Sequence, residues 1–151
     1  MPKYPKPYKF IPKNKEKYKG NIDTIIVRSS WEKEVMIWLD THSKVKSWVS
    51  EELVIPYISP VDNRRHRYFP DFLACIEENG VDVIYLIEVK PKAQTLAPKM
   101  KKRLGKPTKR YVTEVSTYLV NDAKFAAATT FCEKMGWRFK IITENNLKNV
   151  R

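Results

Sequence analysis

The sequence predicts an α/β protein in which helices flank a mixed central β-sheet. The pair Asn79-Gly80 lies between two apolar runs, and this arrangement is the strongest short-range signal of a β-hairpin. Apolar residues recur at helical spacing before and after the hairpin, and residues 137–141 alternate as a closing strand. Because both faces of the hairpin strands are apolar, the hairpin belongs in the middle of a covered sheet.

Residues 1–20 are predicted to form an extended basic arm ahead of a single domain over residues 21–151. Four prolines and seven lysines are interleaved there with aromatic residues, and prolines at that density prevent regular structure. The aromatic side chains suit stacking on bases or docking on a protein partner. A disordered, solubilising tail is the alternative.

The first helix is predicted to begin at Ser29, because Ser29 and Glu32 form a capping box ahead of the helical pattern. Residues 51–57 are predicted to form a strand that ends at Pro56, and residues 62–66 a charged turn.

The central hairpin is predicted over residues 67–76 and 81–90, and its turn fixes the register. A two-residue turn places Asp71 opposite Glu88. Lys90 then lies on the same side as Glu88, because side chains repeat every second residue along a strand.

Two helices are predicted after the hairpin, over residues 111–120 and 122–135. Asn121 is expected to cap the second helix and Gly136 to end it. A short helix over residues 144–149 follows the closing strand.

The chain is strongly basic. It has 29 lysines and arginines against 17 acidic residues, a net charge of +12, which favours a polyanionic partner: RNA, DNA and anionic lipid would all fit. The charge is densest in residues 99–110, where seven of twelve residues are basic and none is acidic. Gly105 and Pro107 break any helix there, so a mobile basic loop is expected.

The remaining composition indicates one soluble globular domain, intracellular where it is made. The length of 151 residues suffices for one core, and no uncharged run approaches the roughly 18 residues of a membrane span. Cys75 and Cys132 lack metal-ligand spacing and are expected to be small buried hydrophobes in a reducing compartment. His42 and His66 lie in charged stretches, where solvated or phosphate-contacting side chains are expected.

The facing pair of Asp71 and Glu88 requires a compensating group. Two carboxylates about 5 Å apart repel by roughly 3 kcal/mol at an effective dielectric constant near 20. Mg²⁺ suits this position, because it takes oxygen ligands from one or two carboxylates together with water and a substrate phosphate. Lys90 would orient or deprotonate a water, or stabilise charge on a phosphate. The alternative is that the carboxylates lie at solvated strand ends and Lys90 pairs with one of them.

Glu32 has two possible roles. As the third residue of the capping box it satisfies a backbone N–H group and needs no metal. At the start of a helix beside the sheet, it would instead add a metal ligand or organise a water.

The spacing of these residues resembles a known signature. Pro70-Asp71, sixteen intervening residues and then Glu88-Val89-Lys90 match the bipartite pattern of the PD-(D/E)xK, or restriction-endonuclease-like, nucleases. With the helix start at residues 28–32 and the continuation to Pro91-Lys92, nearly the whole chain resembles the head completion nucleases of T4-like bacteriophages. It is similar, more distantly, to the transposase subunit that cuts the 5′ ends of a Tn7-type element.

This resemblance implies a restriction-endonuclease-like core and a Mg²⁺-dependent DNA nuclease, with Mn²⁺ as a possible substitute. Both endo- and exonucleolytic action are implied, on packaged DNA, so that a filled head can be joined to its tail in the host bacterial cytoplasm or as a minor virion component. Asp71 and Glu88 become metal ligands, Lys90 the catalytic lysine, and Glu32 an accessory acid and further ligand. Double-stranded DNA is the expected substrate, with portal or head-vertex proteins as further partners. The basic residues expected to contact DNA are Lys92, Lys99, Lys101, Lys102, Arg103, Lys106, Lys109 and Arg110.

Two other functions remain open. A structural head-closure protein could bind DNA or a portal ring without catalysis, although a relic would be free to lose Asp71 or Lys90, and both are present. A restriction-type or transposon-end nuclease would need an added recognition element, for which 151 residues leave little room.

Overall fold

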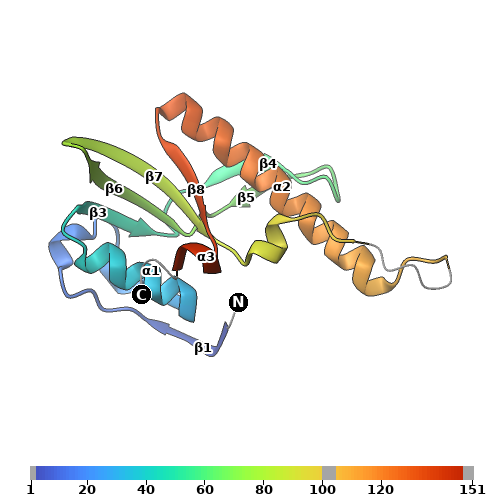
Figure 1. Ribbon diagram of the computed structural model, residues 1–151, viewed down its shortest axis with the longest axis horizontal. Helices are drawn as coiled ribbons and strands as arrows, with labels where there is room; N and C mark the ends of the chain where they lie inside the picture. Colours follow the sequence, from blue (N-terminus) through green and yellow to red (C-terminus); the bar gives the residue numbers. More distant parts are fainter. Residues whose placement is uncertain (1–2, 100–104, 148–151) are drawn as a thin grey trace.

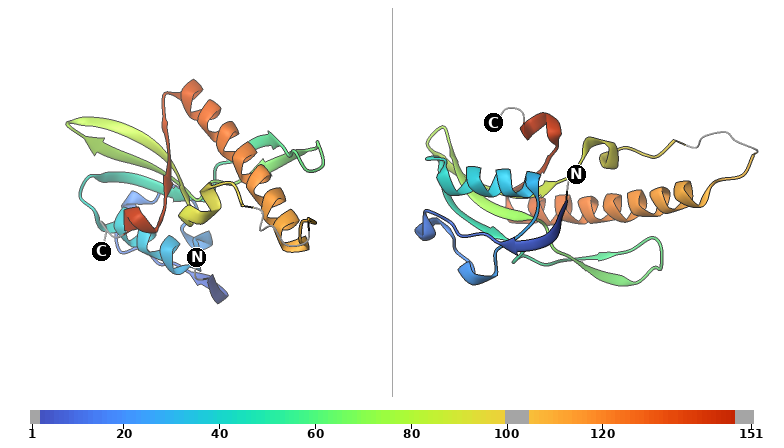
Figure 2. Two further views of the ribbon diagram at one scale, coloured as in Figure 1. Left: turned by 45° about the vertical axis from the view of Figure 1, so that its right-hand side comes forward. Right: turned by 90° about the horizontal axis from the view of Figure 1, so that it is seen from below.

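The computed structural model describes residues 3–99 and 105–147 as a central four-stranded sheet with two smaller two-stranded sheets beside it (Figure 1). The central strand order is β3-β6-β7-β8, with β7 and β8 parallel and the other neighbours antiparallel, so the predicted mixed sheet is confirmed. Helices α1 and α2 cover opposite faces of this sheet (Figure 2). These elements span Ser30–Thr41 (α1), Val45–Ser50 (β3), Phe72–Glu78 (β6), Val81–Val89 (β7), Lys109–Met135 (α2) and Arg138–Ile142 (β8).

The predicted hairpin and its register are confirmed. Strands β6 and β7 pair without a shift from Glu78 opposite Val81 to Phe72 opposite Ile87. Asn79 and its glycine neighbour both have positive φ, at 52° and 80°, as a two-residue turn between twisted strands requires. Asp71 directly precedes β6, and its carboxylate accepts the N–H of Val89, the residue after Glu88, so Asp71 and Glu88 lie at the same end of the hairpin.

Because side chains alternate along its strands, the β6–β7 hairpin contributes to the hydrophobic clusters on both faces of the sheet. Phe72 and Ile87 point towards α1, where they join Val35, Met36 and Leu39. The intervening positions point towards α2 and form a second cluster, whose buried members are Ile55, Tyr68, Leu86, Ala128 and Cys132.

The strand predicted over residues 51–57 does not join the central sheet. It is β4 (Ile55–Ile58), which among the described residues pairs with β5 (Arg65–Tyr68) in a separate hairpin. The strand that pairs with β6 in the central sheet is β3, which the sequence did not predict. β3 escaped detection because its register shifts between Val45 and Ser47, so buried positions do not alternate strictly. Pro56 lies inside β4 and does not end it.

The predicted strand over residues 67–76 is interrupted. β5 ends at Tyr68 and β6 begins at Phe72, with Pro70 buried between them. Proline has no N–H group for a ladder, and the break lets the chain turn from the outer hairpin into the central sheet.

The expectation that prolines exclude regular structure from residues 1–20 is wrong. Lys3–Lys9 form β1, which pairs with β2 (Ile26–Ser29), and short 3-10 turns occupy Lys15–Lys17 and Ile22–Thr24. The β1 prolines fall where the register shifts, on a strand with a single neighbour, so few ladder bonds are lost. The segment is also anchored by buried Asp40, whose carboxylate accepts the N–H groups of residues 13 and 14 at 2.8 and 3.0 Å.

A substitution of Tyr18 tests whether residues 1–20 are part of the folded core. Its ring packs edge-on against Trp48 at 4.8 Å, and its hydroxyl accepts the Ser50 N–H at 3.1 Å. Tyr18→Ala is expected to lower the free energy of unfolding by about 3 kcal/mol, measured by urea denaturation. Ile11→Ala, at a side chain that is 70% exposed, should change it by less than about 0.5 kcal/mol. Equal stability of the two variants would instead indicate a detachable arm.

The two helices predicted after the basic loop are one helix, α2. Thr108 is its N-cap, and Gly136, with φ of 72°, ends it as predicted. Asn121, the expected cap, is buried inside the helix, because a capping residue type does not end a helix that packing continues. The last short helix, α3, spans Glu144–Leu147, and residues 148–149 lie outside the described residues.

Both cysteines are free thiols; Cys132 is buried, as expected, and Cys75 is half-buried. Within the part of the chain that the structure describes, no helix has the length and apolar character to cross a membrane.

Candidate active site

The carboxylates of Asp71 and Glu88 lie where β6 begins and β7 ends. Asp71 Oδ2 accepts the N–H of Val89 at 2.7 Å, which fixes the carboxylate against the neighbouring strand. Glu88 is 6% exposed, and its Oε2 accepts the Tyr68 hydroxyl at 2.7 Å. Lys90 Nζ lies 3.8 Å from Glu88 Oε1. The predicted grouping of two acids and a lysine is therefore present. Glu88 is buried, Asp71 and Lys90 are half-buried, and Lys90 pairs with Glu88.

Burial makes the charged form of this pair costly. It raises the pKa of Asp71 well above its usual range, and the negative charges of Glu88 and Glu32 raise that pKa further. Burial also raises the pKa of Glu88, although the Tyr68 hydrogen bond and Lys90 act in the opposite direction. Two neighbouring carboxylates whose pKa values are raised in this way could hold a hard divalent cation, which would offset the cost of their negative charge.

Glu32 approaches the pair from the start of α1. Its N–H group donates to Ser29 Oγ at 3.1 Å, so the predicted helix cap is confirmed. Glu32 is 8% exposed, and burial raises the pKa of its carboxyl group, as do the charges of Glu51 and Glu88. Within residues 3–99 and 105–147, no three Asp, Glu, His or Cys side chains form a group that could hold a metal ion. Glu32 as a third metal ligand stays a prediction.

Glu51 was missed by the sequence analysis. It follows β3 with φ of 53°, a left-handed conformation that is unfavourable for a side chain with a Cβ atom. Its N–H group donates to the carbonyl of Asp71 at 3.0 Å, and its carboxylate faces Arg28 Nε at 3.2 Å and Nη2 at 3.4 Å. The bend therefore ties the end of β3 to the residue before β6. The left-handed backbone at Glu51 and its hydrogen bond to Asp71 reveal this connection, and no sequence pattern predicted it.

Lys124 and Tyr68 were also missed. Lys124 comes from the middle of α2, and its Nζ lies 5.7 Å from the centre of the Tyr68 ring and 5.8 Å from that of Tyr57. Burial, followed by the charge of Lys90, lowers the pKa of Lys124, while Glu88 and Asp71 raise it. The site thus has a second lysine, held by aromatic rings, which lies far from the motif in sequence.

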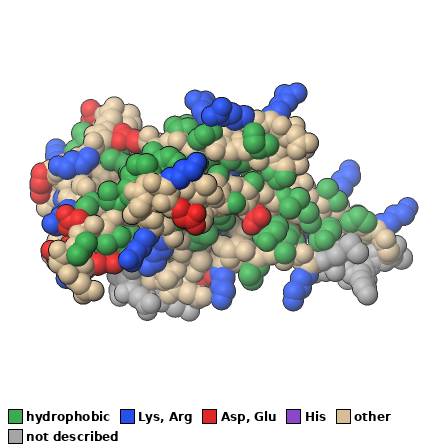
Figure 3. All heavy atoms as spheres, turned by 90° about the horizontal axis from the view of Figure 1, so that it is seen from above, with side chains coloured by type: hydrophobic (Ala, Val, Ile, Leu, Met, Phe, Trp, Pro, Cys, Tyr) green, Lys and Arg blue, Asp and Glu red, His purple; other side chains and the backbone are tan. Residues whose placement is uncertain are grey.

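The predicted DNA contacts are dispersed. Lys92 lies in a 3-10 turn (Lys92–Thr95), where its N–H group donates to Glu144, and Lys99 and Lys106 are exposed. Lys109 and Arg110 are not in a loop but form the first turn of α2, because Thr108 caps the helix there. In the view of Figure 3, the charged side chains that project from this end of the molecule are basic. Lys101, Lys102 and Arg103 lie outside the described residues.

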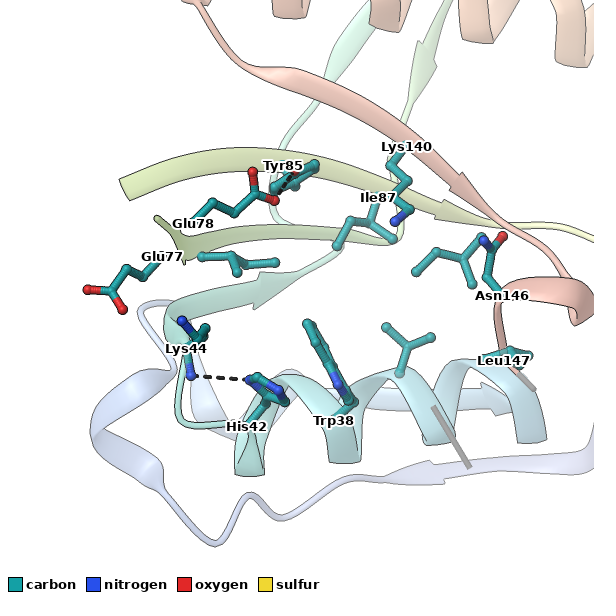
Figure 4. A pocket seen from close by; sticks show the side chains of 13 residues that line it. Trp38, His42, Lys44, Glu77, Glu78, Tyr85, Ile87, Lys140, Asn146 and Leu147 are labelled. Carbon is teal, nitrogen blue, oxygen red and sulfur yellow. Dashed lines mark hydrogen bonds between the residues drawn. The ribbon is translucent and has the colours of Figure 1, made fainter. Parts of the chain in front are cut away.

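A separate pocket of about 390 Å³ lies between α1, the sheet and α3 (Figure 4). It opens on the face that carries Ile87, whereas Glu88 points to the opposite face. His42 lines this pocket, and its Nδ1 accepts the N–H of Lys44 at 3.2 Å, while His66 pairs with Asp62 at 2.8 Å. Neither the pocket nor these histidines belong to the acid cluster, which consists of Glu32, Asp71 and Glu88.

Comparisons with known proteins agree with this geometry. Residues 42–144 match the family described as TnsA-like endonuclease N terminal. Over 141 residues, the chain is 38% identical to the head completion nuclease of Enterobacteria phage T4, an alignment that covers 93% of this chain and 92% of that protein. No match was found among solved structures.

Proposed function

This chain belongs to the TnsA-like endonuclease N-terminal family, and we propose that it is a metal-dependent nuclease that hydrolyses phosphodiester bonds in double-stranded DNA. The observation that carries the proposal is the pair of a half-buried Asp71 and a buried Glu88, with Lys90 Nζ at 3.8 Å from Glu88. Such a pair is costly for a protein that only binds DNA. It is useful to one that must gather positive charge around a phosphate.

Asp71 and Glu88 would hold Mg²⁺, or Mn²⁺ in its place, which when bound polarises a phosphate oxygen and lowers the pKa of an attacking water. Lys90 is positioned to orient that water or to stabilise the charge that builds up on the phosphate. Tyr68 holds the Glu88 carboxylate in one orientation through its hydroxyl. Lys124 would add a second positive charge beside the phosphate, and Glu32 would organise water at the helix start.

The biological setting follows from the relative's name. Head completion by the phage T4 protein suggests that this nuclease also acts on packaged phage DNA, so that a filled head can be joined to its tail. Assembly in the host cytoplasm, with portal or head-vertex proteins as partners, belongs to the same proposal. Both endo- and exonucleolytic action, which the family resemblance implies, are part of this proposal.

A time course on circular and linear duplex DNA tests the activity. With Mg²⁺ or Mn²⁺, we expect nicked and then linear forms from the circle, and shortening of the linear molecules; EDTA should abolish both. The reason is that the carboxylates alone supply no positive charge to polarise the phosphate. Intact circles beside shrinking linear molecules would limit the activity to an exonuclease. Cleavage that persists undiminished in EDTA would overturn the metal dependence.

A further inference from the structure

The outer face of the β4–β5 hairpin is not covered by the rest of the described chain. Its inner face is covered, because Ile55 and Tyr68 are buried against Ala128 of α2. Since side chains alternate along a strand, the next residues of the two strands, Pro56 and Arg67, point the other way. Arg65 and Arg67 of the outer face are both exposed.

Among the described residues, Arg65 and Arg67 have no acidic partner, and Arg64 has only Asp62 of the turn, whose pKa its charge helps to lower. No ion pair joins Arg64, Arg65 or Arg67 to a carboxylate anywhere in residues 3–99 or 105–147. Arg67 instead lies over the ring of Phe69, with its Cζ at 5.7 Å from the ring centre, and that ring is itself 44% exposed. A row of unpaired, exposed guanidinium groups favours an anionic ligand.

The hairpin is preformed rather than loose. Its end is closed by the Ser59 N–H group, which donates to the carbonyl of Arg64 at 2.9 Å, and by the Asn63 N–H group, which donates to the carbonyl of Ser59 at 2.8 Å. The one acid of the turn, Asp62, accepts the N–H of Arg64 and pairs with His66. Little ordering would be required when the arginines bind.

The hairpin is also joined directly to the acid cluster. Tyr68, the last residue of β5, donates to Glu88, and Asp71 follows three residues later. The hairpin and the start of α2 extend past the central sheet on the same side of the molecule (Figures 1 and 2). A two-stranded ribbon of this kind has the dimensions to lie along or in the major groove, which is about 12 Å wide.

We propose that the outer face of the β4–β5 hairpin binds the phosphates of duplex DNA beside the cut site, through Arg65 and Arg67 and with support from Arg64. This inference rests on the proposed function, because it takes DNA as the substrate. Arginine contacts to phosphate position a duplex without reading its bases, so the surface would hold DNA of any sequence against the active site.

The test is a salt titration of binding to a short fluorescent duplex in EDTA, followed by fluorescence anisotropy. Arg65→Ala with Arg67→Ala is compared with Lys134→Ala with Lys140→Ala, which removes the same charge from exposed positions elsewhere. The arginine variant should bind at least about tenfold more weakly, and the slope of log K against log [salt] should become less negative by about 2, because two phosphate contacts are lost. The lysine variant should keep the slope of the original protein.

Arg65→Lys with Arg67→Lys keeps the charge and should keep most of the slope. The inference is overturned if the arginine-to-alanine variant, with an unchanged circular dichroism spectrum, follows the lysine control. Its failure is distinct from that of the proposed function: binding is measured without catalysis, and a protein that cleaves DNA normally without these arginines would refute only the hairpin surface.

Discussion

Asp71→Asn is expected to lower the rate of duplex cleavage by about 10³-fold or more, and Lys90→Ala by a similar factor. Asn at position 71 can still accept the Val89 N–H group, so the strand contact survives while the charge that would hold a metal is lost. Removal of the Lys90 amino group takes away the cation nearest Glu88, and a single preorganised donor at a reacting oxygen is worth about 10² to 10³ in rate. The measurement is the initial rate of plasmid nicking at saturating Mg²⁺.

Lys134→Ala is the control, because that lysine is exposed near the end of α2, ten residues after Lys124, and has no part in the site. Its rate should stay within about twofold of the original protein. Lys124→Met should fall between these limits, at about tenfold, because Lys124 lies over the Tyr68 and Tyr57 rings rather than in contact with Glu88. Folded Asp71→Asn and Lys90→Ala proteins that nick plasmid at the original rate would refute the assignment of the active site.

The same Asp71→Asn change is expected to stabilise the metal-free protein near neutral pH. Burial and the charges of Glu88 and Glu32 raise the pKa of Asp71 in the folded state, whereas in the unfolded chain it lies near 4. The folded state therefore holds the proton more tightly, and the free energy of unfolding falls as the pH rises from about 4 through the raised pKa. Asn is neutral throughout, so Tm at pH 7.5 should increase, by about 3 °C for each kcal/mol regained in a chain of this size.

Thermal melts from pH 4 to pH 8 in EDTA measure this effect. The original protein should lose stability with rising pH more steeply than the Asn variant, while Glu133→Gln, at an exposed helix position, should leave the profile unchanged. Added Mg²⁺ should raise the Tm of the original protein, because a ligand that binds only the folded state stabilises it, and should have little effect on Asp71→Asn. A variant that melts at a lower temperature than the original protein at pH 7.5 would contradict the idea that the site is built at the expense of stability.

Part of the fold was predictable because the signals are local. The Asn79-Gly80 turn requires two residues with positive φ, and a two-residue turn centred on this pair leaves one register for the flanking strands. The cap at Ser29 and the left-handed Gly136 are equally local. Where packing overrides local preference, the prediction failed. Asn121 was predicted to begin a helix but lies inside a longer one. Strand β3 was not predicted, because its register shift disrupts the alternation of buried residues.

Residues 1–20 also show packing that overrides a local preference. Their prolines indicate an irregular arm, and that local preference is correct for an isolated segment. In the folded protein, Tyr18 and Phe10 complete the core around Trp48, and Asp40 holds the backbone between them. Burial of two aromatic rings outweighs the absent proline N–H groups, and only the tertiary contacts disclose it.

By itself, the sequence determined that Asp71, Glu88 and Lys90 share one end of one hairpin, because the spacing of a two-residue turn leaves no other arrangement. Only the tertiary structure decided what surrounds them. Tyr68 and Lys124 come from β5 and α2, and Glu51 directly follows β3. They meet the hairpin because separate elements pack there. The altered proton affinities likewise depend on that packing, since desolvation and the approach of other charges exist only in the folded chain.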